Sequence, residues 1–254
     1  MVHIKTQREI EHLREGGKRL AHIMQQVADA VAPGVSTLDL DTMARKLITQ
    51  AGDTPALLRY KPEGHRTPYP ATICASVDEE IVHGIPNTGP LREGSIISLD
   101  CVIQHAGLFT DYTITVAVGS ITPAAEQLIR ATKRSLEVGI QAARVGNTVG
   151  DIGFAIESFV AGRYGIVREL AGHGVGREIH EDPYVPNFGR PGHGRMLEPG
   201  MVLAIEPMLV EGEPEIEVLD DGYTIITADL SLAAHFEHTV LITEGEPEIL
   251  TSPI

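Results

Sequence analysis

The sequence predicts an α+β domain of two similar halves, with helices outside a curved, mostly antiparallel sheet. Two observations support this fold class. Amphipathic helical segments occur in two consecutive pairs, and strand-like apolar runs follow each pair. The two helix pairs also match each other at a constant offset, which indicates an internal duplication. With 254 residues and 43% hydrophobic content, the chain can bury a large core in one large domain or two small ones, and the two similar halves lead us to expect a single domain over residues 1–254.

The first half opens with two helices. Thr6 and Glu9 form a T-x-x-E capping box, and apolar residues then recur at helical spacing until Pro33. A second helix is predicted from Ser36 to Gly52, with its apolar residues on one face. After a proline-rich loop, three segments have the apolar, β-branched character of strands: residues 72–77, 95–103 and 108–118.

The second half repeats this order. A helix capped at Thr122 is expected to extend to about residue 144, and another extends from Thr148 to about Tyr164. The segment that contains Gly34, Ser36 and Asp39 matches the one that contains Gly146, Thr148 and Asp151, although any two amphipathic helix pairs can show chance similarity. Four further strands are predicted: residues 201–206, 215–219, 223–227 and 235–243.

Composition excludes several classes of function. The chain has 35 acidic and 20 basic side chains and a net charge of −15, which opposes binding to nucleic acid. No segment resembles a signal peptide, and no apolar run approaches the roughly 18 residues that a membrane span needs. We therefore expect a cytoplasmic protein without a membrane partner. Cys74 and Cys101 lie in strand-like runs, which is typical of buried, reduced thiols.

Four of the predicted strands carry a single acid within or at the end of an apolar run. An ionised carboxylate in apolar surroundings is very costly unless a cation or hydrogen bonds compensate it, and no Lys or Arg interrupts these strands at matching positions. One such acid alone is typical of a partly exposed strand, but four in the same pattern indicate a bound metal. The four acids are Asp100, Asp111, Glu206 and Glu237.

Histidines in glycine-rich segments complete the candidate site. His173 lies in A-G-H-G-V-G, a loop in which we expect the glycines to let the backbone pack closely and turn, and its spacing differs from the dinucleotide-binding fingerprint. A glycine-flanked histidine is often only structural, but one imidazole with four carboxylates is an oxygen-rich ligand set. Such a set suits a bridged pair of Mn, Fe, Co or Zn ions rather than a closed structural zinc site. His83 and His180 lie in turn-like segments, where functional side chains and ordinary loop histidines both occur.

With these residues identified, the chain resembles the methionine aminopeptidases of the short bacterial class from about Ile4 to Leu250. Five motifs match the metal ligands of that family, namely S-L-D-C-V, F-T-D-Y-T, G-H-G-V-G, A-I-E-P-M and F-E-H-T-V. Two more, V-H-G-I-P and I-H-E-D-P, match its two substrate-facing histidines. The resemblance implies the pita-bread fold and removal of the initiator methionine from nascent proteins and peptides with a small second residue.

The resemblance also implies a role for each ligand. Asp111 and Glu237 would bridge two divalent ions, Asp100 would hold one ion, and His173 with Glu206 would hold the other. A water that bridges the ions would be the nucleophile, with Glu206 as the general base. The expected partners are peptides with N-terminal methionine and nascent chains at the ribosome, and the expected oligomeric state is a monomer.

The catalytic set implied by the resemblance is Glu206 with His83 and His180. His180 would stabilise the tetrahedral oxyanion together with the metals, and His83 would contact the scissile amide nitrogen or the bound intermediate. The methionine pocket would be formed by Tyr69, Cys74, Ile179 and Tyr223. Ile179 stands where the family often has Phe, and Tyr223 stands where Trp is common. These two differences affect the expected shape of the pocket rather than the metal chemistry.

Two alternatives remain open on the sequence. An Xaa-Pro aminopeptidase of the same fold would carry an additional N-terminal domain, which this chain does not present. A metal-free recognition module would have lost its ligands, whereas all five are present here.

Overall fold

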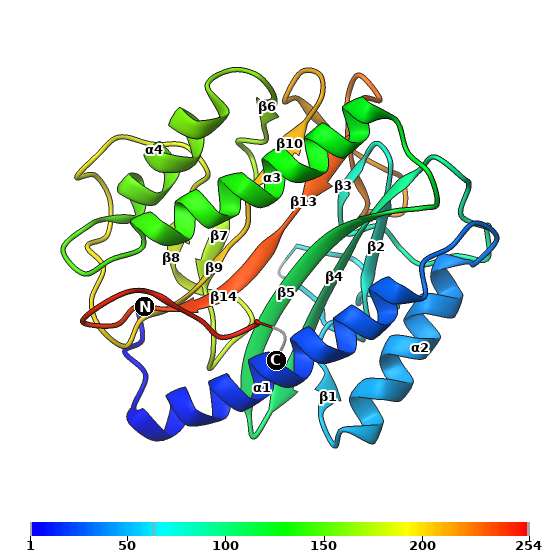
Figure 1. Ribbon diagram of the computed structural model, residues 1–254. Helices are drawn as coiled ribbons and strands as arrows, with labels where there is room; N and C mark the ends of the chain where they lie inside the picture. Colours follow the sequence, from blue (N-terminus) through cyan, green and yellow to red (C-terminus); the bar gives the residue numbers. More distant parts are fainter. Residues whose placement is uncertain (1, 63, 253–254) are drawn as a thin grey trace.

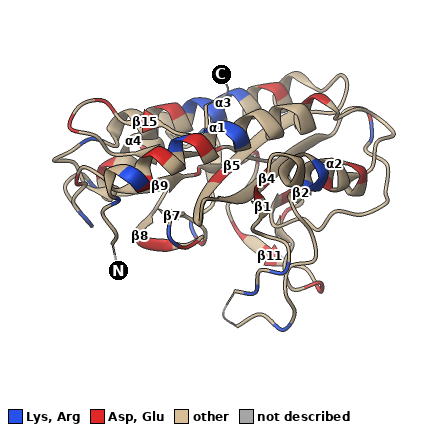
Figure 2. Ribbon diagram, turned by 90° about the horizontal axis from the view of Figure 1, so that it is seen from below, with Lys and Arg blue, Asp and Glu red and all other residues tan. Residues whose placement is uncertain are grey.

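The computed structural model describes residues 2–62 and 64–252, and this part of the chain contains four α-helices. They are α1 (Gln7–Asp29), α2 (Thr37–Gln50), α3 (Pro123–Ala142) and α4 (Val149–Val160). α1 packs against α2, and α3 packs against α4. Figure 2 shows the helices along one side of the strands. The two predicted helix pairs are therefore confirmed, on one side of the sheet.

The two shorter helices begin with the same capping geometry. The Asp39 carboxylate accepts a hydrogen bond from the Ser36 N–H at 3.1 Å, and the Asp151 carboxylate accepts one from the Thr148 N–H at 2.7 Å. The starts of α2 and α4 thus correspond in structure as well as in sequence. One boundary was predicted too far along the chain. α4 ends at Val160 instead of near residue 164, because the next residue, Ala161, adopts a left-handed conformation with φ of 48°.

Within the described residues, nine strands form the main sheet, and all their pairings are antiparallel. The order is β1 (Thr54–Pro55), β4 (Ile96–His105), β5 (Leu108–Ala117), β14 (Glu237–Leu241), β9 (Val202–Ile205), β7 (Gly172–Gly174) and β8 (Glu181–Val185). β2 (Cys74–Val77) pairs with β4, and β15 (Glu248–Ile249) pairs with β14. Figure 1 shows β14 at the centre, between strands of the two halves.

Two small antiparallel sheets complete the described part of the fold. One contains β13 (Ala233–His235), β10 (Met208–Val210) and β6 (Gly165–Ile166). The other contains β11 (Ile216–Val218), β12 (Ile225–Thr227) and β3 (Glu80–Val82). The strand predicted over 235–243 was wrong as a single element. It is split into β13 and β14 at Phe236, whose N–H bonds to the Pro207 carbonyl at 3.4 Å.

Alternation along the strands separates two faces of the main sheet. In β4, Ile97, Leu99 and Cys101 are fully buried in one cluster with the apolar faces of α1 and α2. In β9, Leu203 and Ile205 are buried with α3 and α4 in the same way. The intervening residues of the same strands point to the opposite face, where Val102 of β4 is buried beside Cys74 and Val202 of β9 lies in a cluster that reaches the start of α1. The helices therefore cover most of one face, and the part of the other face around Val102 is available for a site.

The two cysteines match their prediction as buried, free thiols. Cys101 belongs to the helix-covered core, whereas Cys74 of β2 lies on the opposite face. In the part of the chain that the structure describes, none of the helices has both the length and the apolar character needed to cross a membrane.

Candidate metal centre

Strand register places three of the predicted acids on the face that the helices leave free. Asp100 is opposite Thr113 across β4 and β5, and Glu237 is opposite the same residue across β14 and β5. Residues that face each other across antiparallel strands lie on one face, and faces alternate along each strand. Asp111, two residues before Thr113, therefore shares that face with both acids.

The remaining two candidates reach the same face through β9. His173 of β7 is opposite Ala204, and Ala204 is opposite Thr239 of β14. Because Thr239 follows Glu237 by two residues, His173 points to the same face as that acid. Glu206 follows Ala204 by two residues at the end of β9. All five side chains predicted as ligands thus converge on one side of the sheet.

The distances between these groups suit ligands of a shared ion. The Nε2 atom of His173 lies 3.5 Å from Oε1 of Glu206 and 3.9 Å from Oδ2 of Asp111. One ligand atom each from Asp111, His173 and Glu237 lies within 4.8 Å of the others. The Nδ1 atom of His173 is 2.9 Å from the Gly174 carbonyl oxygen, which can only accept, so Nδ1 carries the proton. Nε2 is left with a free lone pair directed at the acids.

The electrostatics of the cluster favour a bound cation. Burial raises the pKa of Asp100, Asp111, Glu206 and Glu237, and repulsion from Glu237 and Asp100 raises that of Asp111 further. One carboxylate oxygen on each of Asp100, Asp111 and Glu237 is buried and accepts no hydrogen bond from the described residues. Burial also lowers the pKa of His173 to about 3, which keeps its imidazole neutral. Carboxylate oxygens without hydrogen-bond donors and a neutral imidazole are suitable ligands for divalent cations.

Both predicted substrate-facing histidines border the same cleft. The ring of His180 lies 4.5 Å from that of His173, centroid to centroid, and its Nδ1 is 3.2 Å from the Tyr60 hydroxyl. His83 follows β3 in a left-handed conformation with φ of 60°, which is uncommon for a residue with a side chain and often occurs at functional sites. His83 is an exposed residue that lines the cleft, and desolvation by the surrounding protein lowers its pKa to about 4.

The four residues predicted for the methionine pocket are brought together. Tyr69, Cys74, Ile179 and Tyr223 belong to one buried apolar cluster. The rings of Tyr69 and Tyr223 meet edge to face at 5.1 Å. The Tyr69 hydroxyl donates to the Gly84 carbonyl at 2.9 Å, so its apolar ring is left to line the space. A cleft of about 270 Å³ connects this cluster to the acids and to the three histidines described above.

Several cleft residues were missed by the sequence analysis. Leu57, Tyr60 and His65 come from loops and belong to none of the motifs, whereas Met208 of the three-residue strand β10 ends the motif A-I-E-P-M without an assigned role. His235 is 2% exposed, and its Nε2 lies 3.3 Å from Oε2 of Glu206. A signal for His235 existed, since it precedes Glu237 by two residues. The break at Phe236 makes that alternation unreliable, because the two residues belong to different strands.

The loop expected around His173 was also a wrong assignment. Residues Gly172–Gly174 form the short strand β7, which lies between β8 and β9. A side chain at Gly172 would place its Cβ 2.2 Å from the Ala204 carbonyl oxygen. The glycines thus allow close strand pairing rather than a turn.

Comparison with known proteins agrees with this arrangement. The model of metallopeptidase family M24 matches residues 11–244. A methionine aminopeptidase of Clostridium perfringens is 43% identical over 252 residues, which cover 99% of each chain. The chain belongs to the methionine aminopeptidases of this family. The crystal structure of methionine aminopeptidase from Rickettsia prowazekii matches with a TM-score of 0.95 at 35% identity, over 99% of this chain and 100% of that one.

A prolidase from Pyrococcus furiosus shares the fold at 20% identity, with a TM-score of 0.76. This chain covers 99% of its own length but only 66% of that prolidase. The pita-bread fold predicted from the resemblance is therefore confirmed, and the likeness to prolidases extends to the fold alone.

Because the pairing of β7 with β9 needs a residue without a side chain at position 172, we expect Gly172→Ala to destabilise the fold. The added methyl group would collide with a strand backbone that cannot rotate away, and overpacking of this kind costs about 1–3 kcal/mol. Urea unfolding of both forms would measure the change. Gly245→Ala is the matched control, because its new Cβ would have no contact shorter than 3.8 Å. Equal stability of the two variants would contradict the close approach.

Proposed function

We propose that the chain hydrolyses the peptide bond after an N-terminal methionine, in peptides and nascent proteins with a small second residue. The observation that carries this proposal is the position of an apolar pocket directly beside a cluster of four buried carboxylates and one imidazole. Such a pocket can hold one long apolar side chain while the scissile bond lies against the acids.

Two divalent ions fit the proposed ligand set. Asp111 and Glu237 would lie between them, Asp100 would hold one, and His173 with Glu206 would hold the other. The chain belongs to a metallopeptidase family, so at least one divalent cation is part of the enzyme. When bound, such ions polarise the substrate carbonyl and lower the pKa of water. The choice among Mn, Fe, Co and Zn depends on availability as well as on ligand type.

The protein's own groups have distinct roles in this proposal. Glu206 would accept a proton from the attacking water and deliver it to the leaving amine, because its carboxylate lies at the edge of the cluster beside His173. His180 would donate a hydrogen bond to the tetrahedral oxyanion from the mouth of the cleft. His83 would contact the scissile amide nitrogen. Neutral imidazoles suit both roles, since each can donate through one nitrogen.

Specificity would come from the pocket of Tyr69, Cys74, Ile179 and Tyr223. Methionine is unbranched and polarizable, so it can pack its sulfur against the two tyrosine rings. A charged side chain would lose its hydration there without gaining a partner. We expect Met-Ala-Ser to be cleaved far faster than Ala-Ala-Ser or Lys-Ala-Ser. Norleucine should remain a fair substrate, since an apolar pocket distinguishes one methylene by only about 1–3 kcal/mol.

Measuring kcat/KM for these peptides, with and without a chelator, tests the proposal. Chelation should abolish cleavage, and added Mn or Co should restore it. An Xaa-Pro peptide distinguishes the remaining enzyme alternative, and it should be a poor substrate. Similar rates for leucine, alanine and lysine at the first position would contradict the methionine pocket. Full activity after exhaustive chelation would contradict the metal requirement.

Four further features are part of the proposal. We expect residues 1–254 to act as one domain, although residues 1, 63 and 253–254 lie outside the described part of the chain. We also expect a monomer that works in the cytoplasm and meets nascent chains at the ribosome. The net charge of −15 disfavours nucleic acid itself as a substrate.

A further inference from the structure

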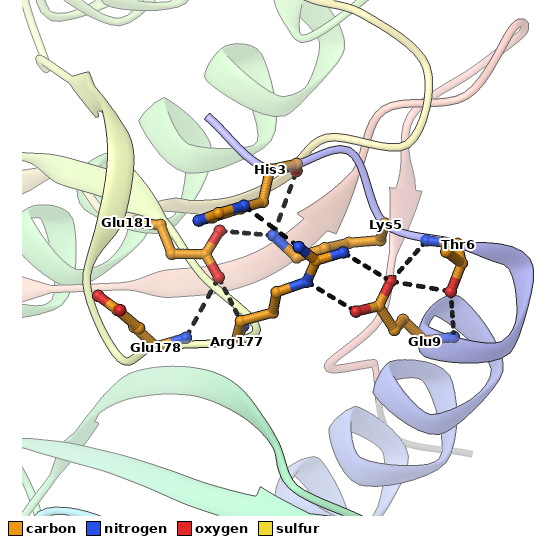
Figure 3. A network of polar contacts seen from close by, with 7 residues as sticks. All are labelled: His3, Lys5, Thr6, Glu9, Arg177, Glu178 and Glu181. Carbon is orange, nitrogen blue, oxygen red and sulfur yellow. Dashed lines mark hydrogen bonds and ion pairs between the residues drawn. The ribbon is translucent and has the colours of Figure 1, made fainter. Parts of the chain in front are cut away.

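A buried ion pair connects the start of the chain to the loop that carries His180. Lys5 precedes α1, and its Nζ lies 2.6 Å from Oε2 of Glu181. The Lys5 and Glu181 side chains are 1% and 2% exposed. Figure 3 shows this pair in a network that joins the N-terminal segment, residues 2–6, and Glu9 of α1 to residues 177–181. Within the sequence, Glu181 directly follows His180 and Ile179.

The second oxygen of Glu181 closes this loop on itself. Oε1 accepts hydrogen bonds from the N–H groups of Arg177 at 2.5 Å and Glu178 at 3.2 Å. Ile179 and His180 lie between these donors and the acceptor. One carboxylate therefore holds both ends of the short segment that presents a pocket residue and a substrate-facing histidine. The position of the Glu181 carboxylate in turn depends on the Lys5 ammonium group, with which it is paired.

The chain makes room for Lys5 in a specific way. A Cβ at Gly176 would lie 2.4 Å from the Lys5 Cε atom. Gly176 also has φ of 140°, a backbone conformation that residues with a side chain rarely adopt. The Lys5 N–H also bonds to the Gly200 carbonyl at 2.8 Å, just before β9. Val2 forms a bridge with Asp182 at the start of β8. The N-terminal segment is thus fixed both to β8 and to the turn before β9, the two strands that flank β7.

Stability alone does not account for this pair. Desolvation of two buried charges offsets much of their attraction, so a buried ion pair often adds little net stability compared with apolar residues. Burial also lowers the pKa of Lys5, while Glu181 opposes that shift. The energy of this pair depends strongly on where the loop lies, because a movement of the loop would leave both buried charges without a partner. This combination favours a function in locating the loop.

We propose that Lys5 is a positioning residue that sets where His180 and Ile179 face the cleft. This inference rests on the proposed aminopeptidase function and assigns a role in it to the N-terminal segment. Lys5 does not touch the substrate. It acts through Glu181, whose carboxylate holds the loop in the orientation that the cleft requires. A small displacement of His180 would weaken its contact with the reacting carbonyl while the acids, which come from other strands, remain in place.

The test compares Lys5→Met with a matched ion-pair variant, Arg14→Gln. Arg14 also joins the N-terminal region to a distant acid, Glu248 at 2.7 Å, but that pair is partly exposed and lies away from the loop. We expect Lys5→Met to lower kcat/KM for Met-Ala-Ser about 10- to 100-fold, mainly through kcat. Its bound metal should equal that of the parent protein. Arg14→Gln should stay within about twofold of the parent rate.

A double variant keeps the test valid if the unpaired Glu181 prevents folding. Lys5→Met with Glu181→Gln removes both charges but retains an oxygen that can accept the N–H groups of Arg177 and Glu178. The double variant should fold and remain slow, because the buried link between Lys5 and Glu181 is lost while the exposed Arg177–Glu9 pair is kept. The NMR ring resonances of His180 should shift in both variants, whether or not methionine peptides are cleaved.

The outcomes separate the two proposals. Failure of the parent protein to cleave Met-Ala-Ser would overturn the proposed function, while the His180 resonances would still test the positioning role. Parental kcat and unshifted His180 resonances in a folded Lys5 variant would overturn the positioning role alone. Loss of bound metal in step with loss of activity would also overturn it, because the effect would then come from the ligands.

Discussion

Replacing Glu206 with Gln should reduce turnover of Met-Ala-Ser by at least about 10²- to 10⁴-fold. The substitution preserves the size of the side chain but removes the basic carboxylate proposed to accept the water proton, and general-base catalysis typically contributes an effect of that magnitude. It also removes an anionic ligand, so weaker metal binding would lower turnover further. Measurements of kcat at saturating Mn or Co, together with metal content, separate the two contributions.

Glu211→Gln is the matched control for this substitution. The Glu211 side chain is exposed and lies outside the cleft, on the strand-to-loop junction after β10. Its loss should leave kcat close to the parent value. If Glu206→Gln kept most of the parent activity with metal bound, the assignment of the base would be wrong.

The two adjacent histidines should respond differently to replacement by Ala. His173→Ala removes the imidazole whose free Nε2 faces Glu206 and Asp111, so the variant should bind less metal and lose nearly all activity. His180→Ala should retain its metal but lose about 10²- to 10³-fold in kcat, because an oxyanion donor acts mainly in the transition state. KM should change much less.

Metal content and steady-state kinetics of both variants decide this prediction. The rings are only 4.5 Å apart, so a general disturbance of the cleft would affect both variants alike. An equal fall in metal content would show that the division into a ligand and a non-ligand histidine is wrong. Far-UV circular dichroism of each variant checks that the fold is intact.

The long elements of the fold could be predicted because their signals are local. Thr6 and Glu9 mark the start of α1 through their own hydrogen bonds, and the hairpin of β4 and β5 has a short turn between two ten-residue strands. The three-residue strands could not be predicted in this way. β3, β7 and β10 are too short for a periodic pattern, and they are strands only because distant residues pair with them.

The acids of the site could be predicted because burial of a charge is visible in sequence as an acid in an apolar strand. Asp100 and Glu237 are typical examples. The cleft walls could not be predicted in the same way, since an ordinary Leu57 or Tyr60 has no local mark of its role. The ion pair of Lys5 and Glu181 was also beyond sequence reasoning. Its partners lie 176 positions apart, and each alone resembles a solvated charge.

The central position of β14 has a consequence for the cohesion of the molecule. β14 joins β5 of the first half to β9 of the second, and the proposed ligands come from strands of both halves. A cation held there would cross-link the halves in the folded state, whereas the unfolded chain has no assembled site. Each tenfold excess of free ion over its Kd would then add about 1.4 kcal/mol to the free energy of unfolding. The concentration of free metal would thus affect the stability of the folded enzyme as well as its activity.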